Sequence, residues 1–207
     1  MHPLLAVLTE NFEFSGSIPA DAAAFLIHHG YPRTAEHVGQ VAEAAASLAR
    51  RFDGNEAQAR LAGWLHDISA VFPNDQRLAV SQAFGVEILP EETEVPLLLH
   101  QKLSAVMAEQ LFDVRDRAVL QAVRCHTTLT AAPSQLDLTL FVADKLAWDQ
   151  KGQPPYADAL IAALSDSLEA AAWVYQDYLM HSGKIKVVHP WMQASYQELK
   201  ARFGAGT

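Results

Sequence analysis

"TAEHVGQVAEAAASLARRF", residues 34–52, decides the fold class of this chain together with the stretch that follows it. Apolar side chains such as Val41 and Leu48 recur here at the spacing of one helix face. An Asp-Gly-Asn turn then opens "DGNEAQARLAGWLHD", residues 53–67, which carries the same pattern. The two stretches predict consecutive amphipathic helices.

The helical pattern extends over most of the chain. Further helices are expected within residues 73–85, 95–112, 114–126, 134–148, 154–180 and 189–203. Residues 184–188, "KIKVV", alternate enough for a short extended segment, but one such piece makes no sheet. The sequence therefore predicts one all-α domain over residues 1–207, with a core at about 30–180 and a C-terminal extension, 181–207, packed on it.

Composition excludes several classes of function. The formal net charge is −9 and no Lys- or Arg-rich block is present, so the surface does not suit a nucleic-acid partner. Cys125 is the single cysteine, which excludes an intrachain disulfide framework and favours a reducing compartment. The first apolar run ends at Leu8, too early for a signal peptide or a membrane span. We expect a cytoplasmic protein without membrane association.

Six ionisable residues occupy positions where the helical pattern places inward-facing side chains. They are His37, His66, Asp67, His100, His126 and Asp144. Asp144, for example, lies between Phe141 and Trp148 in an apolar helical stretch. A buried carboxylate or imidazole is costly without a partner, so each of the six needs one.

Separate partners and a shared metal centre are both compatible with this pattern. Taken singly, a histidine on an apolar face is more often a hydrogen-bonded core residue, and Asp67 fits a helix end. Asp144 alone fits an ion pair with Lys102 or Arg124. One metal centre, however, satisfies all six groups at once.

The donor set indicates the kind of metal. Imidazole and carboxylate without thiolate suit iron, manganese, zinc or similar divalent ions. Six donors exceed the needs of one catalytic ion and fit two ions about 3.5–4 Å apart. Adjacent helix residues point about 100° apart, so Asp67 is better placed to bridge two ions while His66 binds one.

The order of these residues resembles a known family. The first histidine, the His66-Asp67 pair and then Asp144 match the H…HD…D pattern of the HD-domain metal-dependent phosphohydrolases. The two histidines between the pair and Asp144 are typical of the two-metal branch. The stretches "LAGWLHDIS", "HQKLSAVMAEQLF", "VLQAVRCHTTLT" and "LDLTLFVADKLAWDQ" are similar to the YqeK-like proteins of that superfamily, and the resemblance covers about residues 30–180.

This resemblance implies a helical bundle around two divalent transition-metal ions, iron before manganese or another divalent ion. The six residues would be the ligands, with Asp67 as the bridging and catalytic residue. The implied reaction is hydrolysis of a nucleotide phosphoanhydride or phosphoester by a metal-bound hydroxide. Characterised YqeK-like proteins are symmetrical diadenosine tetraphosphate hydrolases, so a small-molecule nucleotide is the expected partner and diadenosine tetraphosphate, cleaved to ADP, the first expected substrate.

The chain departs from the family pattern outside the ligands. Ala70 stands where relatives carry Lys, and Gln101 follows His100 where they carry Gly. The segment "HTTLTAAPS", residues 126–134, lacks their glycine, and "ADKLAWDQ" ends at Gln150 without their Arg. These differences bear on the substrate more than on the reaction.

Four further side chains are candidates for binding substrate phosphate. Each is close in sequence to an expected ligand: Arg33, Lys102, Thr127 and Lys145. Exposed Lys and Arg are the norm, so each cation also fits a solvated surface charge. Thr127 equally fits a helix cap.

Two other functions stay open. HD-type di-iron oxygenases use a similar donor set, and air-dependent oxidation of a substrate would distinguish them from a hydrolase. A non-catalytic regulatory module usually lacks one or more ligands, and none is missing here. Aromatic residues near the C-terminus suit a nucleobase pocket, the core or a homodimer contact: Trp173, Tyr175, Tyr178 and Trp191.

Overall fold

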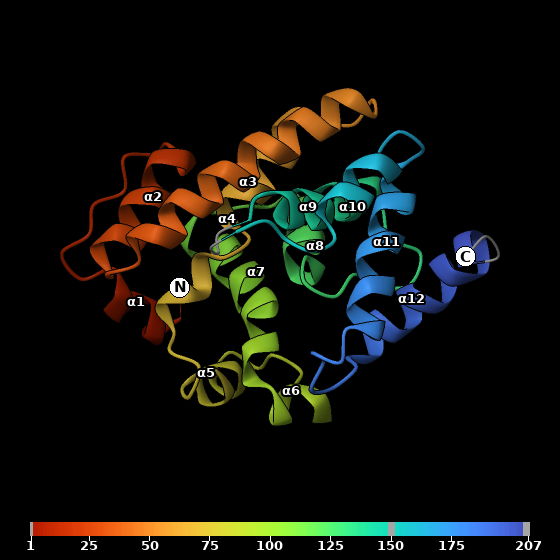
Figure 1. The fold of residues 1–207 in the computed structure, drawn as a ribbon. Helices are drawn as coiled ribbons and strands as arrows, with labels where there is room; N and C mark the ends of the chain where they lie inside the picture. The colour runs from red at the N-terminus through yellow and green to blue at the C-terminus, as the bar shows by residue number, and fades with distance from the viewer. Residues whose placement is uncertain (1, 149–151, 205–207) are drawn as a thin grey trace.

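The computed structural model describes residues 2–148 and 152–204, and over these residues the chain forms helices and no strand (Figure 1). The all-α prediction is confirmed. The helices are α1 (Pro3–Leu8), α2 (Ile18–His28), α3 (Pro32–Arg51), α4 (Glu56–Leu65), α5 (Arg77–Ala83), α6 (Pro90–Glu94), α7 (His100–Leu111), α8 (Arg117–Cys125), α9 (Gln135–Leu146), α10 (Ala157–Ala163), α11 (Leu168–His181) and α12 (Pro190–Phe203), with short 3-10 segments η1 (Ile68–Val71) and η2 (Pro96–Leu99). Within the described ranges no helix combines the length and the apolar character that a membrane crossing requires. Gln150 lies outside the described residues.

The pair α3 and α4 forms the centre of the packing. α3 also packs along α9, and α4 packs against α8 (Figure 1). Gly63 allows the close approach of α4 to α3, because a Cβ at this position would lie 2.4 Å from the Cα of Ala42. This approach brings His37 on α3 near His66 at the end of α4.

Helices α7, α8 and α9 complete the core around these two. α7 packs against α8 and η1, and α8 packs against α9. Their inward faces are apolar, with Leu103, Val123 and Phe141 almost inaccessible to solvent. The inward stripes expected from the sequence therefore meet in one core.

The prediction of one continuous helix over residues 154–180 is wrong. The chain instead forms α10 and α11, separated at residues 164–167. The Ser167 hydroxyl accepts a hydrogen bond from Ala170 N at 3.0 Å and caps α11. Serine is favoured at such a cap because its side chain satisfies a backbone N–H that the helix leaves unpaired.

The C-terminal helix packs on the rest of the bundle through α11 (Figure 1). The rings of Trp173 and Tyr196 stack with their centroids 5.2 Å apart. Residues 184–188, for which a short extended segment was expected, form no strand and lead into α12.

Candidate metal centre

Three of the candidate histidines stand at helix ends. His66 is the C-cap of α4, His126 is the C-cap of α8, and His100 follows η2. In each, Nδ1 donates to the carbonyl oxygen three residues earlier: His66 to Gly63 at 2.8 Å, His100 to Leu97 at 2.6 Å and His126 to Val123 at 2.8 Å. These bonds satisfy carbonyls that a helix end leaves free. In the neutral ring they place the hydrogen on Nδ1, so that Nε2 is the atom available to a metal.

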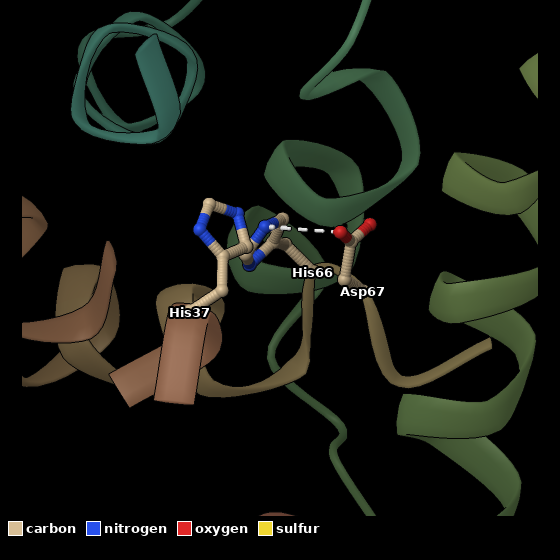
Figure 2. A group of neighbouring side chains, drawn as sticks. All are labelled: His37, His66 and Asp67. Atoms are coloured by element: carbon tan, nitrogen blue, oxygen red, sulfur yellow. Dashed lines mark ion pairs between the residues drawn. The ribbon is translucent and has the colours of Figure 1, made fainter. Parts of the chain in front are cut away.

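The carboxylate of Asp67 lies between these rings. Its Oδ1 is 3.5 Å from His100 Nε2 and 3.6 Å from His126 Nε2. Its Oδ2 is 3.7 Å from His66 Nε2, and Figure 2 shows this pair. The two oxygens therefore face different histidines.

Asp144 closes the other side of the cluster. Its Oδ1 is 3.1 Å from His37 Nε2 and 3.5 Å from His66 Nε2. The rings of His37 and His66 lie beside each other, with centroids 5.2 Å apart (Figure 2). Asp144 lies on α9, His37 lies on α3, and His66 stands at the end of α4. Three helices separated in sequence therefore meet on this side of the cluster.

The ligand atoms form two groups that share one residue. The first group is His37, His66 and Asp67, and the second is Asp67, His100 and His126; within each group the atoms lie within 4.8 Å of one another. Two ligand atoms that bind the same ion at about 2.0–2.2 Å lie about 3–4 Å from each other. The distances between ligand atoms within each group agree with this spacing.

Two further observations fit a cation at this position. The buried His66 Nε2 has no hydrogen-bond partner among the described residues. The Nε2 atoms of His100 and His126 are 3.1 Å apart although both rings carry their hydrogen on Nδ1. Unpaired buried nitrogens and facing lone pairs are costly, and a divalent metal ion would satisfy both.

Both carboxylates of the cluster are held in the ionised form. Burial alone would raise the pKa of Asp67, but His66, His126 and His100 together hold that pKa far below its usual range. Burial acts in the same way on Asp144, and Lys145 and the neighbouring histidines hold its pKa well below the usual value. The site thus presents fixed negative charge to a cation.

Two of the predicted phosphate contacts lie at the cluster. Lys145 is buried and its Nζ forms an ion pair with Asp144 Oδ2. Thr127 Oγ1 is 3.0 Å from His100 Nε2. Gln101 holds this threonine in place, because its Oε1 accepts a hydrogen bond from Thr127 N at 3.1 Å.

The other two predicted phosphate contacts do not join the cluster. Lys102 follows His100 by two residues and so points to a different face of α7. Its Nζ lies 2.8 Å from Glu92 and donates to the carbonyl of Glu87 at 2.9 Å. Arg33 is exposed in the first turn of α3 and makes no hydrogen bond or ion pair with a described residue of the cluster.

One residue at the site was not recognised in the sequence. Arg77 at the start of α5 is only 7% exposed, and its Nη1 donates to Leu97 O at 3.1 Å, the carbonyl that also accepts His100 Nδ1. Val80 and Ser81, three and four residues later in α5, are buried as well. In a helix of only seven residues, this spacing is too short for the sequence alone to identify the inward face.

Comparisons with known proteins identify the family of the chain. The HD domain family matches residues 34–171. A Lactococcus lactis subsp. cremoris protein from the pepC 5′ region is 42% identical over 146 residues, which is 70% of this chain and 74% of that protein. A symmetrical bis(5′-nucleosyl)-tetraphosphatase of Staphylococcus aureus is 29% identical over 110 residues, 52% of this chain and 55% of that enzyme. The alignment thus spans about half the length of this named relative.

A solved structure shows the same fold. The crystal structure of an HD superfamily hydrolase from Clostridium acetobutylicum, described as involved in NAD metabolism, superposes with a TM-score of 0.78. The match covers 88% of this chain and 97% of the other at 22% sequence identity. At that identity the likeness establishes the arrangement of helices alone.

Proposed function

The chain belongs to the HD domain family of metal-dependent phosphohydrolases, and we propose that it hydrolyses a dinucleoside tetraphosphate symmetrically, with diadenosine tetraphosphate as the first substrate. The observation that carries the proposal is the position of Asp67 between two groups of histidines. The named S. aureus relative, a symmetrical tetraphosphatase, supports the substrate class.

The residues divide into two proposed ligand sets. His37, His66, Asp67 and Asp144 would hold one divalent ion, and Asp67, His100 and His126 would hold the other. Iron is the first expected metal and manganese the second, since both accept imidazole and carboxylate ligands. When bound, such ions lower the pKa of a coordinated water and neutralise charge on phosphoryl oxygens.

The protein's own side chains orient the reactants. Asp67 would set the separation of the two ligand sets, and the surrounding histidines favour the ionised form that this role requires. Lys145, which pairs with Asp144, and Thr127, which lies beside His100, would contact phosphate oxygens of the substrate. In the overall reaction water adds to a phosphorus, one phosphoanhydride bond breaks, and two nucleoside diphosphates leave.

A direct assay tests this function. Protein purified without chelator should contain two transition-metal ions per chain, as the shared-carboxylate geometry requires, and should convert diadenosine tetraphosphate to ADP under anaerobic conditions. Asp67→Asn should lose this activity. Asp158→Asn, the same substitution at an exposed position of α10, should keep it. Products other than ADP would exclude symmetrical cleavage, and full activity in Asp67→Asn would overturn the shared-ligand mechanism.

A further inference from the structure

Arg77 is a buried cation that lacks a carboxylate partner. Among the described residues, three Lys and Arg side chains are almost completely buried: Arg77, Lys102 and Lys145. Lys102 pairs with Glu92 and Lys145 pairs with Asp144. Arg77 forms no ion pair with any described residue, although burial of an unpaired charge is costly.

Two backbone carbonyls hold the guanidinium in a fixed orientation. Its Nε donates to Phe72 O at 3.2 Å and its Nη1 donates to Leu97 O at 3.1 Å. The second terminal nitrogen, Nη2, has no hydrogen-bond partner within residues 2–148 and 152–204. A planar guanidinium tied at two of its nitrogens presents the third with little further loss of side-chain entropy.

The orientation places Arg77 next to the second ligand set. Leu97 O accepts hydrogen bonds from both Arg77 and His100, so the two side chains share one anchor. Burial lowers the pKa of Arg77, and the Asp67 carboxylate partly offsets this effect. Asp67 and Arg77 are nevertheless too far apart to form an ion pair.

We propose that Arg77 binds a phosphate oxygen of the substrate through Nη2, on the side of the metal centre formed by His100 and His126. The proposal rests on the proposed function, because it assigns the anion that this cation lacks to the substrate. Arginine suits this task, since its weakly hydrated guanidinium donates charge-assisted hydrogen bonds to phosphate. A bound substrate phosphate would then supply the negative charge that the Arg77 guanidinium lacks among the described residues.

A purely structural role is the alternative. The two bonds to Phe72 O and Leu97 O tie the segment after η1 to η2, and a neutral donor could serve that purpose without the cost of a buried charge. The two roles predict different behaviour toward a phosphate probe that carries no nucleoside. Inorganic pyrophosphate is such a probe.

The experiment titrates inorganic pyrophosphate into the manganese-loaded full-length protein by calorimetry. Arg77→Met, which keeps the length of the side chain and removes the charge, should weaken pyrophosphate binding about 10- to 100-fold, the range for one hydrogen bond to a charged group. The matched control is Arg60→Met, on the outer side of α4, where the guanidinium pairs with Glu43. This control should bind pyrophosphate as the unaltered protein does.

Metal content and folding are measured on the same samples. Arg77→Met should keep its two ions per chain, as expected for a residue that is not a ligand. Arg77→Lys keeps the cation and one donor to the carbonyls, so it should fold like the unaltered protein and recover part of the pyrophosphate affinity. Equal pyrophosphate binding by Arg77→Met and Arg60→Met, no pyrophosphate binding by the unaltered protein, or no recovery in a folded Arg77→Lys would each overturn the proposal.

The outcome separates this inference from the proposed function. If pyrophosphate binding depends on Arg77 but no nucleotide is hydrolysed, the anion contact stands and the phosphohydrolase assignment fails. If nucleotides are hydrolysed and pyrophosphate binding does not depend on Arg77, the assignment stands and the anion contact fails. A rise in KM with little change in kcat for Arg77→Met would support the contact in the active enzyme.

Discussion

His100 and His126 face each other with their Nε2 atoms 3.1 Å apart. Each ring already donates its Nδ1 hydrogen to a backbone carbonyl, so the facing nitrogens are both acceptors. Burial lowers the pKa of both rings, that of His100 to about 4, which disfavours a shared proton as the solution. A metal ion bound by the two rings and Asp67 would remove the repulsion, and the stability of the fold would then depend on metal.

Removal of metal is therefore expected to lower the melting temperature. A ligand present at about 100 times its dissociation constant stabilises the folded state by about 2.7 kcal/mol, and for a chain of this size that corresponds to about 5–10 °C. We expect chelation to lower Tm by this amount and added manganese to restore it. Differential scanning calorimetry measures both steps.

The control for this prediction is Asp67→Asn. The amide is a weaker metal ligand at the position that both groups share, so chelation should change the Tm of this variant much less. A Tm that does not respond to metal in the unaltered protein would contradict the idea that the facing histidines are arranged around an ion.

Replacement of Gly63 tests how α3 and α4 position their histidines. A Cβ here would lie 2.4 Å from Ala42 Cα and 2.7 Å from Ala42 N, so Gly63→Ala must push the two helices apart. Overpacking of this kind costs about 1–3 kcal/mol, and urea unfolding should show a loss of at least that size. Metal content should fall as well, because Gly63 O accepts the Nδ1 hydrogen of His66.

The matched control is Gly54→Ala in the turn before α4. A Cβ there would be 3.4 Å from its nearest neighbour, the Cα of Ala49, which is an ordinary contact. Gly54→Ala should leave the unfolding free energy nearly unchanged. If Gly63→Ala proved as stable as Gly54→Ala, the close approach of α3 and α4 would not be what sets the distance between His37 and His66.

Lys102 is expected to act on stability and not on substrate binding. It lies in a buried cluster with Glu92 and under the ring of Trp191, with 4.7 Å between Nζ and the ring centroid. Lys102→Met leaves Glu92 without this partner, and breaking a buried pair in this way costs about 3–5 kcal/mol. Tm should fall while KM for the nucleotide stays unchanged. The control is Lys200→Met, a change at an exposed position of α12. A raised KM at unchanged Tm in Lys102→Met would show that Lys102 contacts the substrate phosphate after all.

Much of the cluster of histidines and aspartates could be predicted because its residues follow a periodic pattern. His37 and Asp144 lie on helix faces with apolar neighbours, and packing of those faces brings them within 3.1 Å of each other. The same rule explains the success of the all-α prediction, since amphipathic stripes must meet in a core. The ligand types, imidazole and carboxylate without thiolate, then indicate a divalent metal ion.

The outer residues could not be placed in the same way. Arg77 begins a helix of only seven residues, too short for its periodicity to distinguish an inward from an outward face before the fold is known. Lys102 is close to His100 in sequence but turns away from it, because sequence proximity along a helix does not imply a common face. The break before Ser167 depends on a cap hydrogen bond that competes with an otherwise continuous apolar stripe.

Glu92 should make the stability of the protein depend on pH in the acid range. Its carboxylate is inaccessible to solvent and accepts hydrogen bonds from Lys102, from Leu89 N and, at 3.2 Å, from His189 Nε2. Burial would raise the pKa of Glu92, but these partners together lower it below the usual value. A carboxyl group whose pKa is lowered on folding contributes stability above its unfolded pKa, and that contribution is lost as the pH falls through its folded pKa.

Glu92→Gln is the variant that isolates this effect. At neutral pH it should be less stable than the unaltered protein, because Lys102 and His189 lose the charged acceptor they share. As the pH falls below about 4, the ordinary range for a glutamate, the difference should shrink. Glu92 of the unaltered protein is protonated first in the unfolded state and then, at its lower pKa, in the folded state. Urea unfolding of metal-free protein at several pH values measures the two curves. If the unfolding free energies of the two proteins changed in parallel across the acid range, Glu92 would titrate alike in the folded and unfolded states. Its contacts with Lys102 and His189 would then not be a source of acid sensitivity.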